Sequence, residues 1–222
     1  MIYVINKSTV ASDATVKKWC AALRIQVKRD FAPAWGLVKP PALRFRRSTL
    51  FIPRTSRVWI IAVLDNADQA GALGYHSTDD RGRPYARVFV QTAQEYGVEP
   101  STTFSHEVLE TYGDPDVSQW ADTGHGYQVP VEVCDAVEGD SYAINGVQVS
   151  NFLTPVWFGE NSNGPRDFMM KTPGPFELAP GGYTVRQYSS GKVDQVFGER
   201  ANREYVAAKD HSQLGRSGRR RR

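Results

Sequence analysis

Residues 105–117 read Ser105-His-Glu-Val-Leu-Glu-Thr-Tyr-Gly-Asp-Pro-Asp-Val117, and they are the most informative stretch of the chain. His106, Glu110 and Asp116 follow the spacing His-Glu-x-x-Glu-x-x-Gly-x-x-Asp, and Glu107 comes directly after the first of them. On a helix, His106 and Glu110 are one turn apart and share a face, so both can reach one metal ion. The spacing therefore predicts a metal-ligating helix.

The ends of this helix are also marked in the sequence. Pro100 stops the preceding segment, and one of residues 101–103 can cap the first free N–H groups. Gly113 suits a left-handed residue at the C-terminus, and Pro115 forbids continuation of the helix. A sharp reversal at Gly113 would return Asp116 to the same ion.

Glu107 is not one of the three expected ligands and stands beside them. A metal ion lowers the pKa of a coordinated water, and Glu107 can take the proton of that water as a general base. The carboxylate of Glu110 makes the ion a weaker Lewis acid than an imidazole would. One histidine with two carboxylates can hold zinc, and it makes calcium or manganese more plausible than two histidines would. The alternative is an acidic helix end whose carboxylates face water.

The segment resembles the active-site helix of the metzincins, a subgroup of the zincin metallopeptidases, whose pattern is His-Glu-x-x-His-x-x-Gly-x-x-His/Asp. His106, Glu107, Gly113 and Asp116 match this pattern, and Glu110 departs from it. The resemblance implies a peptidase in which His106, Glu110 and Asp116 hold zinc and Glu107 activates water. The departure at Glu110 implies a lower activity, because a carboxylate ligand makes the ion a weaker Lewis acid.

Three stretches also resemble an uncharacterised group of proteins from tailed phages and bacteria that carry the same glutamate. These stretches are residues 105–110, Glu132-Val-Cys-Asp135 and Phe176-Glu-Leu-Ala-Pro-Gly-Gly-Tyr183. This second resemblance covers most of the chain and brings no established activity. It implies an alternative function, an inactive zincin-shaped structural or binding protein with phage structural proteins as partners. The expected location is the cytoplasm of a bacterial host or the phage virion.

The order of the expected elements predicts an α+β fold. Before the 101–113 helix we expect a strand at 2–5, a helix from Ser12 or Asp13 to about Phe31, and strands at 57–64, 72–78 and 85–91. This order resembles the N-terminal half of a zincin, with a mixed sheet, an N-terminal helix and an active-site helix. In that family an edge strand beside the metal pairs with extended substrate, and the hairpin 72–91 would supply it.

The second half of the chain is expected to be rich in strands and loops. Residues 128–135 predict a strand, and Asn145-Gly146 predicts a two-residue hairpin turn between 142–144 and 147–149. Residues 151–188 are rich in Pro and Gly and are expected to wrap over the first half without a core of their own. We expect one zincin-like domain over 1–190, divided into 1–120 and 121–190.

Further residues could join the site. Glu132 or Asp135 could replace Asp116 as a ligand or hold His106 from outside the ligand set. Strand alternation would place Glu132 and Cys134 on one face and Asp135 on the other face or at the strand end.

Three other features are weaker candidates. Phe168-Met169-Met170 is similar to the methionine beneath the metal in metzincins, although core packing is the favoured interpretation. His76 and His125 are the other histidines in the expected fold, and His125 lies in a glycine-rich loop.

Composition restricts the class of protein. The chain has 222 residues, 41% of them hydrophobic, which suits one folded domain. Cys20 and Cys134 are too few for a disulfide scaffold and fit a reducing compartment, although a single bridge stays open. No secretory signal is visible, and the longest apolar run, 58–64, is too short to cross a membrane.

The net charge of +3 is unevenly distributed. Residues 191–222 hold nine Lys and Arg against four Asp and Glu, a balance of +5, and end in Arg219-Arg-Arg-Arg222. Such a run is typical of a solvated basic tail that can touch nucleic acid by charge alone. No aromatic residues lie between the arginines, which argues against sequence-specific binding.

Overall fold

The computed structural model describes residues 1–199 except 50, 51, 54, 56, 70, 71, 161 and 162. Its fold is α+β, as expected, and its first half is a five-stranded sheet in the order β2-β1-β3-β5-β4. The strands are β1 Ile2–Asn6, β2 Leu43–Arg46, β3 Trp59–Leu64, β4 Gly74–Thr78 and β5 Pro84–Phe89. All neighbours pair in parallel except β4, which is antiparallel to β5 and forms one edge.

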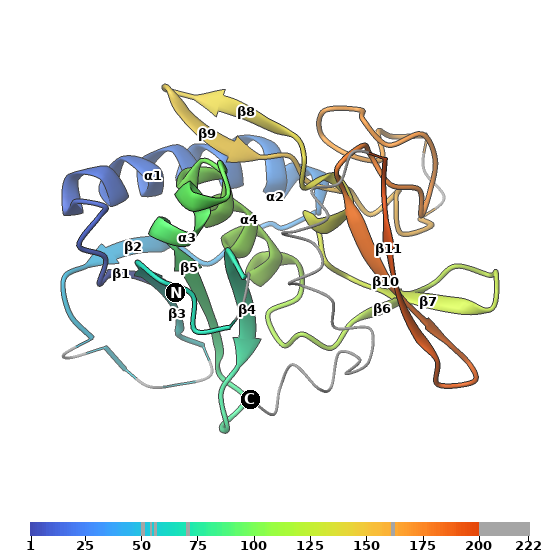
Figure 1. The fold of residues 1–222 in the computed structure, drawn as a ribbon, viewed down its shortest axis with the longest axis horizontal. Coiled ribbons are helices and arrows are strands. Elements are labelled where there is room, and N and C mark those ends of the chain that lie inside the picture. The colour runs from blue at the N-terminus through green and yellow to red at the C-terminus, as the bar shows by residue number, and fades with distance from the viewer. Residues whose placement is uncertain (50–51, 54, 56, 70–71, 161–162, 200–222) are drawn as a thin grey trace.

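Two helices cover one face of this sheet (Figure 1). The first is α1, Asp13–Ile25, which continues through a π-helical segment, Gln26–Phe31, into α2, Ala32–Ala34. Ser12 caps α1 by accepting a hydrogen bond from Thr15 N. The second is α4, Pro100–Gly113, which follows the short helix α3, Val90–Glu95.

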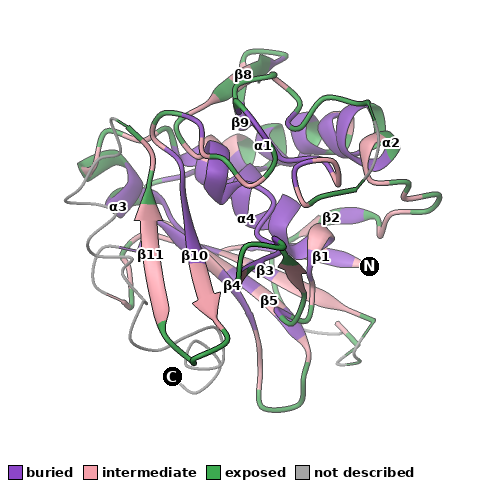
Figure 2. Ribbon diagram, turned by 90° about the vertical axis from the view of Figure 1, so that its right-hand side faces the viewer, coloured by how far each residue is buried: buried purple, intermediate pink, exposed green. Residues whose placement is uncertain are grey.

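The main hydrophobic core lies between this sheet and its helices. Val16 and Leu23 of α1, Ile61 and Val63 of β3, and Val108 of α4 belong to it and have no exposed surface. Figure 2 shows that α4 is buried along most of its length. A helix covered on all sides can carry polar groups only if they find partners within the protein, which makes its histidine and glutamates informative.

The second half of the chain forms a separate antiparallel sheet in the order β11-β10-β7-β6, on the right in Figure 1. Its strands are β6 Trp120–Asp122, β7 Tyr127–Pro130, β10 Tyr183–Tyr188 and β11 Val193–Phe197. A hairpin of β8, Ser141–Ile144, and β9, Val147–Ser150, lies over α4. Its turn is Asn145-Gly146, as expected, and both residues have the positive φ that this turn requires.

Two expectations about the second half need correction. Val129, Val137, Leu153 and Trp157 form part of a second buried cluster, so this half does have a small core of its own. Its apolar residues are spread over short strands and loops, which gives no periodic signal in the sequence. The expected basic tail from 191 begins with β11, and the arginines that motivated it lie outside the described residues.

Some elements differ from the expected ranges for local reasons. The 85–91 strand stops at Phe89 because the chain turns into α3 there, and neither α3 nor β2 was expected.

Within the described residues, no helix is long and apolar enough to cross a membrane.

Candidate metal centre

The helix α4 is fixed at its N-terminal end by the hairpin above it. It begins at Pro100 with Glu99 as the N-cap, and the expected side-chain cap from residues 101–103 is not observed. Instead, the hydroxyl of Ser101 donates to Gln148 O of β9 at 2.8 Å, and Ser105 Oγ accepts from the N–H of the β9 residue Ser150 at 2.5 Å. These bonds set the position of the turns that follow, which carry the candidate ligands.

The C-terminal end of α4 corrects the predicted role of Gly113. Gly113 is the last helical residue and is not left-handed. A Cβ atom built on it would lie 2.4 Å from Cγ1 of Val133, so glycine is needed here for close packing. Asp114 then accepts hydrogen bonds from Ser118 N and Gln119 N.

Asp116, which we expected to return to the metal, is exposed on the turn after Asp114. It belongs to neither of the two ligand groups that the described residues form. The expected ligand set of His106, Glu110 and Asp116 is therefore not brought together by this fold.

The segment after β7 approaches α4 instead. The predicted strand 128–135 ends at Pro130, and Glu132 N donates to Pro130 O in a tight turn. Leu153 N donates to Val133 O at 2.6 Å, and a 3-10 helix, η2, runs over Asp135–Val137. The alternation argument fails because this segment is not a strand, and Glu132 and Asp135 both reach the histidines of the site.

The Phe176–Tyr183 stretch supports η2 from behind. Ala179 N donates to Ala136 O at 3.0 Å, and a Cβ atom on Gly182 would lie 2.1 Å from the same oxygen. The glycine therefore lets this stretch press against the residue that follows Asp135. This contact gives a physical role to one of the three stretches noted in the sequence.

The first group of candidate ligands comes from one turn of α4. His106, Glu107 and Glu110 are buried, and they offer ligand atoms that all lie within 4.8 Å of one another. Nε2 of His106 is 3.1 Å from Oε1 of Glu110 and 3.2 Å from Oδ1 of Asp135. We expected Glu132 or Asp135 to bind the ion in place of Asp116 or to hold His106. The contact between Asp135 and His106 agrees with this expectation.

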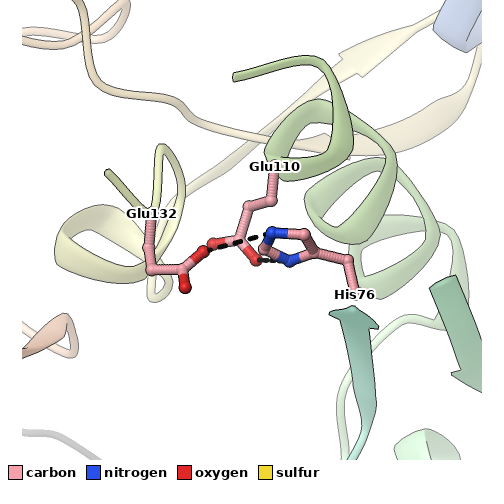
Figure 3. A group of neighbouring side chains, drawn as sticks. All are labelled: His76, Glu110 and Glu132. Atoms are coloured by element: carbon pink, nitrogen blue, oxygen red, sulfur yellow. Dashed lines mark ion pairs between the residues drawn. The ribbon is translucent and has the colours of Figure 1, made fainter. Parts of the chain in front are cut away.

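The second group joins three elements and was not predicted (Figure 3). It contains His76 of β4, Glu110 of α4 and Glu132 of the segment after β7, again within 4.8 Å of one another. Nδ1 of His76 is 3.2 Å from Oε2 of Glu110, and Nε2 is 3.6 Å from Oε2 of Glu132. Glu110 belongs to both groups.

The signal for His76 was present in the sequence but was not used. In β4, Gly74 and His76 are two residues apart and both are buried, so they share the strand face that meets α4. A Cβ atom on Gly74 would lie 2.7 Å from Cγ and from Oε1 of Glu107. From the sequence, alternation along the predicted 72–78 strand already places His76 on the same face as Gly74.

The side chains of the site differ in the direction of their pKa shifts. Burial lowers the pKa of His76, but Glu132 and Glu110 outweigh it and raise this pKa to about 9. Burial has the same effect on His106, and Glu110 and Asp135 raise its pKa well above the ordinary value. Burial raises the pKa of Glu110, whereas the two histidines lower it well below its usual range. For Asp135, burial and the charge of Glu110 raise the pKa to about 6. Protons on the histidines thus offset the charge of the carboxylates.

The donors fit a divalent transition-metal ion. Imidazole nitrogen and carboxylate oxygen are ligands of zinc and manganese. Neighbouring ligands about 2.1 Å from one ion lie roughly 3.0–3.4 Å apart. The contacts of His106 and His76 with Glu110, at 3.1 and 3.2 Å, fall in this range.

Two of the weaker candidates lie elsewhere. His125 is exposed on its loop and is in neither group. Met170 is 78% exposed and Met169 is partly exposed, so the favoured interpretation of core packing is wrong for this pair. Phe168, beside them, stacks on the buried ring of Phe152 at 5.1 Å between ring centroids.

Comparison with known proteins adds no assignment to this geometry. No protein-family model, no curated protein and no solved structure matches the chain.

Proposed function

We propose that this chain is a zincin-like, metal-dependent hydrolase that cleaves peptide bonds. One observation carries the proposal. His106, Glu107 and Glu110 lie buried on one helix, and Glu107 packs directly against Gly74 of the sheet's edge strand β4. The pattern in the sequence and the position of the helix beneath an edge strand support the same class of enzyme.

In this proposal His106 and Glu110 hold the ion, and Asp135 is the third ligand in place of the expected Asp116. When bound, a divalent ion polarises the scissile carbonyl and makes water more acidic. Oδ1 of Asp135 lies 3.2 Å from Nε2 of His106, a separation that suits two ligands of one ion. Zinc is the expected ion, with manganese or calcium as alternatives, and calcium suits a site containing imidazole least.

Glu107 is the proposed general base. Its neighbours on the same turn are the proposed ligands, and it is held between α4 and β4. A carboxylate in this position takes a proton from the attacking water and returns it to the leaving amine. No other residue of the described site has this position between the ligands and the edge strand.

The substrate in this proposal is an extended peptide or protein segment. Among the described strands, β4 pairs only with β5, so its outer edge can accept a further strand. Backbone hydrogen bonding to an open sheet edge binds extended peptides with little dependence on their side chains. The peptide would then lie above Glu107.

A second candidate function has its own supporting observation. The side chains of His76, His106, Glu110 and Glu132 are only 2–5% exposed. Such burial suits an ion that stabilises a zincin-shaped structural or binding protein, with phage structural proteins as partners. This alternative needs an ion but no base.

The Glu107→Gln variant separates the two functions. Glutamine keeps the shape of the side chain but cannot accept the proton, so we expect unchanged metal content and loss of peptide hydrolysis. Elemental analysis and digestion of a peptide library by the wild type, Glu107→Gln and His106→Ala are the measurements. If the wild type and Glu107→Gln bind metal and all three proteins are equally inactive, the hydrolase is rejected in favour of the structural protein.

A further inference from the structure

We propose that Glu110 bridges two divalent cations, one held with His106 and a second held with His76 and Glu132. The proposal rests on the cation site on α4 that the proposed function uses, and adds to it a second site assembled from three elements. The ligand class is a transition-metal ion that accepts imidazole and carboxylate, such as Zn²⁺ or Mn²⁺.

The two oxygens of Glu110 face different histidines. Oε1 is 3.1 Å from Nε2 of His106, and Oε2 is 3.2 Å from Nδ1 of His76. A carboxylate that bridges two ions binds one ion through each oxygen, so its two oxygens must face two different sets of ligands. In two-metal hydrolytic sites the ions lie about 3.5–4 Å apart, a separation that a bridging carboxylate spans.

One ion does not account for both histidines. His76 and His106 fall in different groups, each defined by ligand atoms within 4.8 Å of one another. Ligands on opposite sides of an ion, each about 2.1 Å from it, are roughly 4.2 Å apart at most. The groups share only Glu110, so each histidine serves its own ion.

The surroundings of His76 point to a ligand. His76 is buried, and its Nε2 makes no hydrogen bond within the described part of the chain. Its distance of 3.6 Å to Oε2 of Glu132 is too long for a hydrogen bond but close to the spacing of two ligands on one ion. A buried imidazole nitrogen is normally hydrogen-bonded or bound to a metal. Because Glu110 and Glu132 contact opposite nitrogens of the His76 ring, one ion takes only one of these nitrogens, and the three residues offer one ligand atom each within 4.8 Å of one another for it.

Two ions are also compatible with the charge of the cluster. The four buried carboxylates of the site carry four negative charges when ionised, and they belong to Glu107, Glu110, Glu132 and Asp135. Buried charge needs compensation by opposite charge or hydrogen bonds. Two divalent cations neutralise this set with both imidazoles uncharged, as metal ligation requires.

The bridge gives a reason for glutamate at position 110. An imidazole presents one nitrogen to an ion, and its second nitrogen points away across the ring. A carboxylate on the same turn can address two ions with adjacent oxygens. The residue that departs from the metzincin pattern is therefore the one that a second ion requires.

Metal stoichiometry tests the proposal on the full chain. Protein dialysed against Zn²⁺ or Mn²⁺ is measured by native mass spectrometry and elemental analysis. We expect two equivalents in the wild type, one in His76→Ala and one in Glu132→Gln. His125→Ala is the matched control, because His125 is exposed and outside both groups, and should retain two. Electron paramagnetic resonance of the Mn²⁺ form should show spin coupling between two ions, which both site variants lose.

Each outcome has a defined meaning. One equivalent in the wild type that both variants retain overturns the second site and leaves the cation of the proposed function in place. One equivalent that His76→Ala or Glu132→Gln loses overturns the bridge and also the cation site of the proposed function. No bound metal overturns both proposals. If His76→Ala does not fold, the near-isosteric Glu132→Gln variant and the wild-type Mn²⁺ spectrum decide. An uncoupled Mn²⁺ spectrum with two bound ions would reject the bridge.

Discussion

Gly113 and Val133 are in such close contact that a Cβ atom on the glycine would lie 2.4 Å from Cγ1 of the valine. Gly113 ends the helix that carries the first ligand group, and Val133 lies between the acids Glu132 and Asp135. Their contact therefore sets how closely the second segment approaches the helix. A small residue at position 113 is a condition for the site.

We predict that Gly113→Ala destabilises the protein by about 1–3 kcal/mol, the usual effect of overpacking a core. An exposed Gly→Ala change inside a helix would instead stabilise the protein by about 1 kcal/mol. The sign of the change in the free energy of unfolding therefore distinguishes the two cases. Metal affinity should fall as well, because the 131–135 segment must move. Urea denaturation and metal titration are the measurements. The double variant Gly113→Ala/Val133→Ala should recover part of both losses, and a purely additive result would contradict the contact.

The first half of the fold was predictable because its signals are local. Ser12 caps a helix with one apolar face, and β3 is a run of β-branched and apolar residues. In the second half, the hairpin turn at Asn145-Gly146 is equally local, because it follows from the positive φ that both residues tolerate. These patterns depend on neighbours within a few positions, so one sequence is sufficient to read them.

The second half was less predictable because tertiary contacts determine it. The segment at Val131–Cys134 has the composition of a strand, but only Val131 continues the pairing, by donating to Gln119 O beside β6. Glu132 then bonds to Pro130 and Val133 to Leu153. For the same reason, spacing identified His106 and Glu110 and failed for Asp116. Spacing along a helix is fixed, whereas the direction of the chain beyond Asp114 depends on how its carboxylate accepts the N–H groups of Ser118 and Gln119.

Gly74→Ala should affect catalysis more than metal binding. The new Cβ atom would meet Cγ and Oε1 of Glu107 at 2.7 Å and displace the proposed base. The three heavy atoms nearest to the added methyl all belong to Glu107. We expect unchanged metal content and at least a 10-fold loss of peptide hydrolysis, since a misplaced base loses much of its contribution. A parallel loss of metal would show that the strand, and not the base, had moved.

Asp167 should stabilise the loop beneath the hairpin in a manner that depends on pH. Its carboxylate is buried and accepts hydrogen bonds from Asn151, Met169, Lys171 and Thr172. Burial raises the pKa of Asp167, but these hydrogen bonds outweigh it and hold the pKa below the ordinary value of 3.8. The stabilisation is therefore present above this value and is lost as the pH falls through the lowered pKa.

The Asp167→Asn variant tests this effect, because asparagine does not titrate and turns an N–H group towards the same donors. We expect it to be less stable than the wild type by about 1–3 kcal/mol at neutral pH. The difference should shrink as the pH falls below about 3.8 in the unfolding curves of the two proteins. Asp80→Asn, on an exposed turn, is the matched control and should change little. A difference between the Asp167 proteins that is constant with pH would contradict the assignment to the carboxylate.

Glu110→His restores the metzincin pattern and separates the roles of the two histidines. An imidazole at position 110 can still share an ion with His106, which lies one turn away, but it offers no second oxygen to His76. We therefore expect Glu110→His to bind one Zn²⁺ in place of two. The double variant Glu110→His/His76→Ala should retain this ion, and Glu110→His/His106→Ala should lose it. Because a neutral ligand leaves the ion a stronger Lewis acid, peptide hydrolysis with added zinc should rise relative to the one-ion variant His76→Ala. Elemental analysis and digestion of the same peptide library measure both effects. Glu110→Gln, which keeps the shape but weakens both contacts, should bind neither ion tightly. Two ions in Glu110→His would show that Glu110 is not the bridge.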